Sequence, residues 1–127
     1  MKSYDELYAL ITQRGVHPEF GDAGAGWGIE QSAHELATFL VRMEELGVQS
    51  VLEIGTGYKG GLSRFLAADM GWQVTSVDVQ DYGHKFEGVT YIVTPKGYAP
   101  QMGARFDLVF IDGDHDYDSV KWDYENW

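Results

Sequence analysis

Residues 50–61, SVLEIGTGYKGG, place a carboxylate beside a cluster of glycines. Glu53 belongs to a short apolar run, Val51 to Gly55, that predicts a buried strand. An ionised carboxylate buried without partners is costly, so we expect hydrogen-bond donors around it. We expect these donors to be the amides of the glycine turn together with a positively charged group on a ligand.

The glycines form a turn whose spacing is typical of nucleoside sites. Gly55, Gly57 and Gly60 fit the pattern GxGxxG, and Gly61 and a predicted helix follow directly. Asp78, 18 residues past Gly60, ends the next predicted strand, where an acid can accept hydrogen bonds from the two hydroxyls of a ribose. The alternative is a tight turn without a ligand and an acid that only ends a strand.

Glu53 distinguishes two classes of ligand that share this geometry. A dinucleotide brings a pyrophosphate, and the strand before the glycines is then normally apolar throughout. S-adenosylmethionine brings a sulfonium and an ammonium instead, and a carboxylate in the turn attracts both cations. Glu53 therefore favours S-adenosylmethionine as the ligand.

A second polar cluster lies at residues 111–118, IDGDHDYD, directly after another predicted strand. Its ionisable members are four acids and a histidine: Asp112, Asp114, His115, Asp116 and Asp118. In a parallel sheet this cluster shares an edge with the glycine turn. Asp116 and Asp118 also suit the start of a helix, where the helix dipole favours acids. A calcium loop is excluded, because Tyr117 stands where that loop needs glycine.

The elements that must position these residues alternate between helical and strand periodicity. Ser3 and Glu6 form a capping box ahead of the first helix. We expect helices and strands in the following order: helix 3–15, loop 16–28, helix 29–47, strand 51–55, helix 62–70, strand 73–79, strand 89–94, strand 106–112 and helix 117–127. This order predicts an α/β fold, a parallel sheet with helices on both faces.

The predicted domain organisation has two parts. Residues 1–28 form an N-terminal helix and a glycine-rich loop, and residues 29–127 form the ligand-binding α/β domain. Trp27 in the loop could close over a ligand, although such a tryptophan more often packs against the nearest helix. A sheet of only four strands would leave edges and apolar surface uncovered. We therefore expect the N-terminal part of a longer domain, or a homo-oligomer that covers the exposed sheet edge.

Composition narrows the classes of partner. Nine Lys and Arg stand against twenty Asp and Glu, which gives a formal charge of -11 and predicts repulsion from nucleic acid and from anionic membranes. The absence of cysteine excludes disulfides, thiolate catalysis and cysteine-based zinc sites. The sequence starts without a signal-peptide pattern and has no long apolar stretch. A cytoplasmic protein acting on a small molecule, with no nucleic acid or membrane partner, is the expectation.

The motifs together resemble a known family. VLEIGTGYKGG at 51–61, followed by SVDV at 76–79 and FDLVFIDGDHDYDSVKWD at 106–123, is similar to class I S-adenosylmethionine-dependent methyltransferases. More narrowly, it resembles their small-molecule O-methyltransferase branch with an IDGxHxY motif. The resemblance covers residues 29–127 and implies a seven-stranded Rossmann-like sheet, of which this chain holds the N-terminal part, to the fourth strand.

The resemblance also implies roles for individual residues. The cofactor-binding set would be Glu53, Gly55, Thr56, Gly57, Gly60, Gly61, Asp78, Val79 and Asp112. Within it, Asp78 would hold the ribose and Val79 would lie beside the adenosine. Asp112 would also ligate Mg²⁺ or another divalent cation, and His115 would be the catalytic base that takes a proton from the acceptor hydroxyl. Thr94 and Pro95 stand where the family often has an acid near the adenine, so that contact stays unassigned.

Two other interpretations stay open at this point. One is a fragment of an NAD-type dinucleotide-binding oxidoreductase, which Glu53 disfavours. The other is a non-catalytic module that binds S-adenosylmethionine or only a partner chain. The full metal site of the family needs acids that follow a fifth strand, so catalysis by these residues alone is a separate question from cofactor binding.

Overall fold

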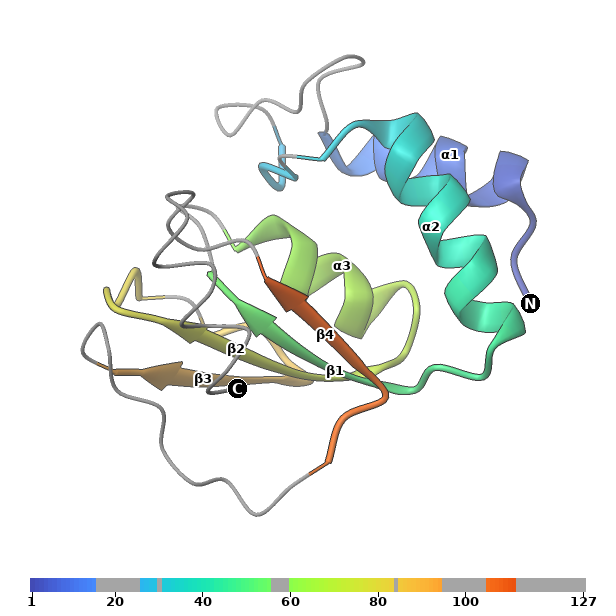
Figure 1. The fold of residues 1–127 in the computed structure, drawn as a ribbon. Coiled ribbons are helices and arrows are strands. Elements are labelled where there is room, and N and C mark those ends of the chain that lie inside the picture. Colours follow the sequence, from blue (N-terminus) through green and yellow to red (C-terminus); the bar gives the residue numbers. More distant parts are fainter. Residues whose placement is uncertain (16–25, 30, 56–59, 84, 95–104, 112–127) are drawn as a thin grey trace.

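The computed structural model describes residues 1–15, 26–29, 31–55, 60–83, 85–94 and 105–111. In chain order the elements are α1 (Tyr4–Gly15), α2 (Ala33–Glu45), β1 (Ser50–Ile54), α3 (Gly61–Ala68), β2 (Gln73–Asp78), β3 (Val89–Val93) and β4 (Leu108–Ile111). Figure 1 shows these helices stacked over one twisted sheet. The predicted helix at residues 117–127 lies outside the described residues.

The sheet is parallel, with the strand order β3-β2-β1-β4. After β1 the chain adds β2 and then β3 on one side, and it returns to place β4 on the other side of β1. The direction of chain order thus reverses between β1 and β4. In open α/β sheets, ligands bind beyond the carboxyl ends of the strands at such a reversal. The predicted α/β class with a parallel sheet is confirmed.

The register aligns one row of residues across the sheet. Glu53 on β1 pairs with Ser76 on β2 and with Phe110 on β4, and Ser76 pairs in turn with Tyr91 on β3. Paired residues of neighbouring strands point to the same face. Because Ser63 of α3 contacts Glu53, this row lies on the face that the helices cover.

The described helices pack on one face of the sheet and share one core with it. Figure 1 shows α3 directly over the strands and α1 with α2 at its side. The fully buried members of this core come from all of these elements and include Leu7, Ile11, Leu40, Val51 and Phe65. A smaller cluster, Leu52, Ile54 and Val77, lies on the opposite face.

The two ends of β4 are held beside β1 in different ways. At the amino end, the carboxylate of Asp107 accepts the backbone N–H groups of Gln49 and Ser50, at 2.8 and 3.2 Å, and the Asp107 N–H donates to the Ser50 hydroxyl. At the carboxyl end, Ile111 pairs with Ile54. This alignment brings the end of β4 to the same edge as the end of β1.

Most predicted elements agree with the structure to within two residues, but the start of α2 does not. The predicted helix began at Ile29, whereas α2 begins at Ala33. Ser32 is the N-cap, and its hydroxyl accepts the N–H of Glu35 at 3.2 Å. Ile29 is fully buried in the core ahead of the helix. The apolar periodicity therefore extended past the true helix start, which the Ser32-x-x-Glu35 pattern marks.

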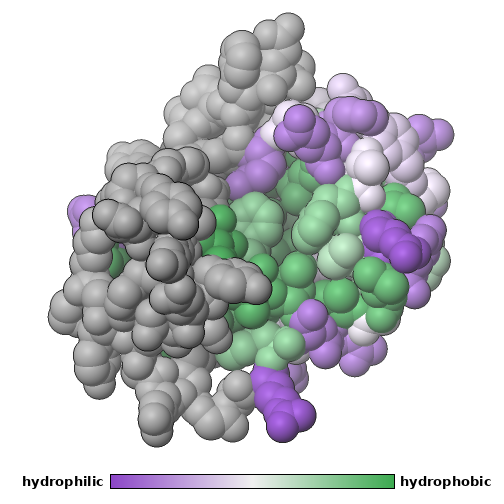
Figure 2. Space-filling view, viewed as in Figure 1, coloured by the Kyte–Doolittle hydropathy of each residue, from purple (hydrophilic) through white to green (hydrophobic). Residues whose placement is uncertain are grey.

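Where Figure 2 colours the surface, hydrophobic side chains gather in the middle of the view and hydrophilic ones lie mainly toward the top, the right and the lower edge. Val109 on β4 is 42 % exposed. Within the part of the chain that is described, every helix is too short or too polar to cross a membrane.

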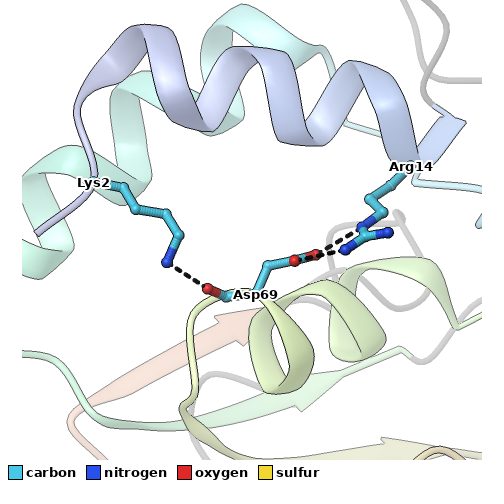
Figure 3. Close-up of polar contacts among 3 residues, drawn as sticks. All are labelled: Lys2, Arg14 and Asp69. Atoms are coloured by element: carbon cyan, nitrogen blue, oxygen red, sulfur yellow. Dashed lines mark hydrogen bonds and ion pairs between the residues drawn. The ribbon is translucent and has the colours of Figure 1, made fainter.

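A polar clamp ties both ends of α1 to the end of α3 (Figure 3). The Lys2 ammonium donates to the backbone oxygen of Asp69 at 2.8 Å, and the Arg14 guanidinium donates twice to the Asp69 carboxylate, at 2.9 and 3.1 Å. Both cations lie at the C-terminus of α3, where the helix dipole favours them. Hydrogen bonding to Asp69 raises the pKa of Arg14, so the guanidinium stays protonated.

We expect Asp69→Asn to lower the free energy of unfolding by about 1 kcal/mol, because the bidentate pair loses its charge while the side chain keeps its shape. The matched control is Glu45→Gln, which neutralises a more exposed pair with Arg42 and should cost less than about 0.5 kcal/mol. Urea denaturation of the three proteins at low salt measures both values. Equal losses in the two variants would contradict a structural role for the clamp.

Candidate functional site

Glu53 lies near the carboxyl end of β1 and is only 2 % exposed. Its Oε1 accepts a hydrogen bond from the hydroxyl of Ser63 on α3 and a second one, at 2.9 Å, from the hydroxyl of Ser76 on β2. Both serines are fully buried. The protein itself thus supplies donors to the buried carboxylate, and the sequence argument, which named the turn amides and a ligand, missed both.

The sequence held only a partial signal for these two serines. Ser63 interrupts the apolar face of a short helix, and Ser76 lies in a strand that is otherwise rich in β-branched residues. A small polar residue at a buried position suggests a polar partner. The partner of each serine depends on the strand register and on where α3 crosses the sheet. The local sequence pattern predicts neither.

The surroundings of Glu53 combine opposing electrostatic effects. Ser63 is in the first turn of α3, so the carboxylate lies close to the positive end of that helix dipole. On β3, burial raises the pKa of the Tyr91 phenol and the charge of Glu53 raises it further, while a hydrogen bond with the Phe86 backbone and the charge of Arg64 lower it. The net shift is upward, so this phenol is neutral at physiological pH.

The ends of the glycine turn have backbone conformations that favour glycine. Gly55 has a φ of 101°, and its N–H donates to the carbonyl of Val77 at 2.7 Å, which extends the β1–β2 ladder by one residue. Gly60 has a φ of 64° and is the N-cap of α3. Both angles lie in the left-handed region, where a side chain is strained. Thr56 and Gly57 lie outside the described residues.

Gly61 has a different structural requirement. A Cβ atom built on it would lie 2.3 Å from the carbonyl oxygen of Trp27 and 2.8 Å from the nitrogen of Ile29. Residues 27–29 therefore pass directly against the first residue of α3. The close approach of two backbones explains this glycine independently of any ligand.

Two arginines contact the ring of Trp27. The guanidinium of Arg14 lies 4.4 Å from the centroid of the Trp27 ring, and that of Arg64 lies 4.1 Å from it. Arg64 also lies 4.5 Å from the ring centroid of Phe86. These contacts join the loop to α1 and α3, which is the packing role that the sequence offered as the alternative to a lid.

Asp78 and Val79 lie at the end of β2, on the same edge of the sheet as the glycine turn. The Asp78 carboxylate is partly exposed and accepts the N–H of Gln80 at 3.1 Å, and its backbone oxygen accepts the N–H of Thr94 at 3.0 Å. Val79 is 58 % exposed, which is unusual for a valine at the end of a buried strand. The turn after β2 therefore places the carboxylate of Asp78 beside the exposed side chain of Val79.

The second predicted cluster is not part of the described structure. Asp112 and His115, the predicted metal ligand and catalytic base, follow β4 but lie outside the described residues. Within the described ranges, no three His, Asp or Glu side chains come together in a way that could hold a metal ion. The roles predicted for Asp112 and His115 therefore stay predictions.

We expect Gly61→Ala to destabilise the protein by about 2 to 4 kcal/mol, because the new methyl group would overlap backbone atoms of residues 27–29. The sign of the change in unfolding free energy is informative. Where space allows, Ala is favoured over Gly inside a helix by about 1 kcal/mol, so a loss of stability would point to the steric overlap. Ala68→Gly in the same helix is the control, and it should cost only that propensity difference. Thermal unfolding compares the variants, and a stabilised Gly61→Ala protein would contradict the close approach.

Comparison with known proteins identifies a family. A methyltransferase domain family matches residues 37–127, more than two thirds of the chain. No curated protein and no solved structure matches significantly. The matched region holds β1 to β4, α3 and most of α2, and the parallel sheet with its helices is consistent with the Rossmann-like fold of methyltransferases. The match and the fold agree, and this chain belongs to the methyltransferase domain family.

Proposed function

We propose that this chain binds S-adenosylmethionine at the carboxyl edge of the sheet and transfers its methyl group to a hydroxyl of a small molecule. Membership of the methyltransferase family supports methyl transfer, and the family implies this methyl donor. The observation that carries the choice of ligand is Glu53, a buried carboxylate held by two hydroxyls at the chain reversal between β1 and β4. A negative charge there favours a cationic ligand over a pyrophosphate.

The cofactor would lie across the ends of β1 and β2. In this proposal Glu53 and the glycine turn, which includes Thr56, hold the methionine part, Asp78 holds the ribose, and Val79 lies beside the adenosine. The support is that the described members of this set share one edge, because Ile54 pairs with Val77 at the ends of neighbouring strands. Glu53 acts on the ammonium directly or through one water molecule.

For methyl transfer the protein mainly has to align the methyl donor with the acceptor hydroxyl and remove one proton. The methyl donor, when bound, would supply a methyl group on a sulfonium: the sulfur–methyl bond would break as the acceptor oxygen bonds the methyl carbon, and the electron pair would stay on sulfur. The hydroxyl proton needs a base, and we assign that role to His115. Asp112 would ligate a divalent cation such as Mg²⁺, which would lower the pKa of the acceptor hydroxyl.

We expect the chain to bind S-adenosylhomocysteine, the product of the donor, and not NAD. Glu53→Gln should weaken this binding about tenfold, which corresponds to about 1.4 kcal/mol, because the ammonium loses a charged partner. The control is Glu45→Gln, which removes one negative charge from an exposed position of α2. This variant should bind S-adenosylhomocysteine as the wild type does. Isothermal titration measures all three proteins. Binding of NAD without a response to S-adenosylhomocysteine would overturn the proposal.

We expect His115→Ala to lower methyl transfer by a factor of about 10² to 10⁴, the usual contribution of a general base, while S-adenosylhomocysteine still binds. His34→Ala is the control, because His34 on α2 pairs with the hydroxyl of Tyr4, at 2.7 Å, on the surface between α1 and α2. Transfer of a radiolabelled methyl group to a panel of hydroxylated small molecules is the measurement. A wild type that binds but methylates no acceptor would favour the non-catalytic module.

A further inference from the structure

The two serines that contact Glu53 come from different elements and act on the same oxygen. Ser63 lies on α3, above the sheet, and Ser76 lies beside Glu53 on the neighbouring strand. Both hydroxyls donate to Oε1 of the carboxylate. Two donors that reach one oxygen from two directions limit the rotation of the carboxylate about its side-chain bonds.

Burial makes these contacts hard to replace. Ser63 and Ser76 have no exposed surface, and Glu53 is 2 % exposed. Water therefore cannot substitute for either hydroxyl without a rearrangement of the core. Hydrogen bonds to an ionised group favour its charged form, and the loss of one would leave the buried charge undersolvated.

Other ionisable groups around Glu53 come from the elements that pack against it. Tyr91 on β3 is neutral at physiological pH, as its raised pKa indicates. Arg64 on α3 is stacked between the rings of Trp27 and Phe86. Among the described residues, the hydroxyls of Ser63 and Ser76 both contact this carboxylate directly, one from α3 and one from β2.

We propose that Ser63 and Ser76 are positioning residues for the cofactor: they hold the Glu53 carboxylate ionised and in place, and thereby set the affinity for the cationic amino-acid half of the methyl donor. This inference rests on the proposed function. It makes a selective claim: in the proposed pose the adenosine half would lie at Asp78 and Val79, so its binding should not depend on the two serines.

Two ligands separate the halves of the cofactor. S-adenosylhomocysteine carries the ammonium, whereas 5′-methylthioadenosine keeps the adenosine and the thioether but has no amino acid. We expect Ser76→Ala to weaken the first about tenfold and the second less than twofold, as measured by isothermal titration. Ser76→Thr keeps a hydroxyl and should recover most of the lost affinity. Thr75→Ala, at the adjacent position on the opposite face of β2, should bind both ligands as the wild type does.

A double-mutant cycle tests whether Ser76 acts through Glu53. If it does, adding Ser76→Ala to Glu53→Gln should weaken S-adenosylhomocysteine no further than Glu53→Gln alone. Ser63→Ala provides a second route to the same answer if Ser76→Ala does not fold, because alanine is well tolerated within a helix. It should show the same selective loss.

The outcomes distinguish this inference from the proposed function. Wild-type binding of S-adenosylhomocysteine together with unchanged binding by both serine variants would overturn the positioning role and leave the proposed function standing. Equal losses for both ligands would show a general effect on the site and would also overturn it. A wild type that binds neither ligand would overturn both proposals.

Discussion

A carboxylate that lies within an apolar sheet has lost the water that stabilised its charge, and donors in the protein must replace that water. Glu53 meets this requirement through Ser63 and Ser76, which reach it from a helix and from a neighbouring strand. The requirement links three elements, because the contacts exist only when β1 and β2 are in register and α3 crosses above them. The geometry around this one charge therefore depends on the assembled fold.

The first turn of α3 is the place where several constraints meet. Ser63 in this turn contacts Glu53, Gly60 caps the helix in a left-handed conformation, and Gly61 lies against residues 27–29. The N-terminal segment is attached at the same helix through the stacking of Arg64 on Trp27. The Glu53 contact and the contacts of the N-terminal region therefore meet on the same short helix.

The other end of α3 is held by charge. Asp69 contacts a cation at each end of α1: its backbone oxygen accepts from Lys2, and its carboxylate accepts from Arg14. A short helix has few hydrogen bonds of its own, so its stability comes mostly from packing and from contacts at its ends. Contacts therefore hold α3 at both ends, with Asp69 at its C-terminus and Ser63 in its first turn.

Local patterns in the sequence determined the class of fold and much of the candidate site. The apolar runs, the glycine turn, the charge of Glu53 and the strand-ending Asp78 are each visible within about ten residues, and the elements found agree with them. The roles of these residues toward a cofactor stay predictions. The start of α2 was predicted four residues too early, because apolar periodicity continued through Ile29, which is buried in the core without being helical.

Only the tertiary structure decided which groups meet. Strand register set Ser76 beside Glu53, and the crossing of α3 set Ser63 above it. The contact of Gly61 with Trp27 joins residues more than thirty positions apart, and no local pattern reports it. Secondary structure follows short-range periodicity, which a single sequence displays, whereas pairing and packing depend on the relative placement of distant segments, which it does not.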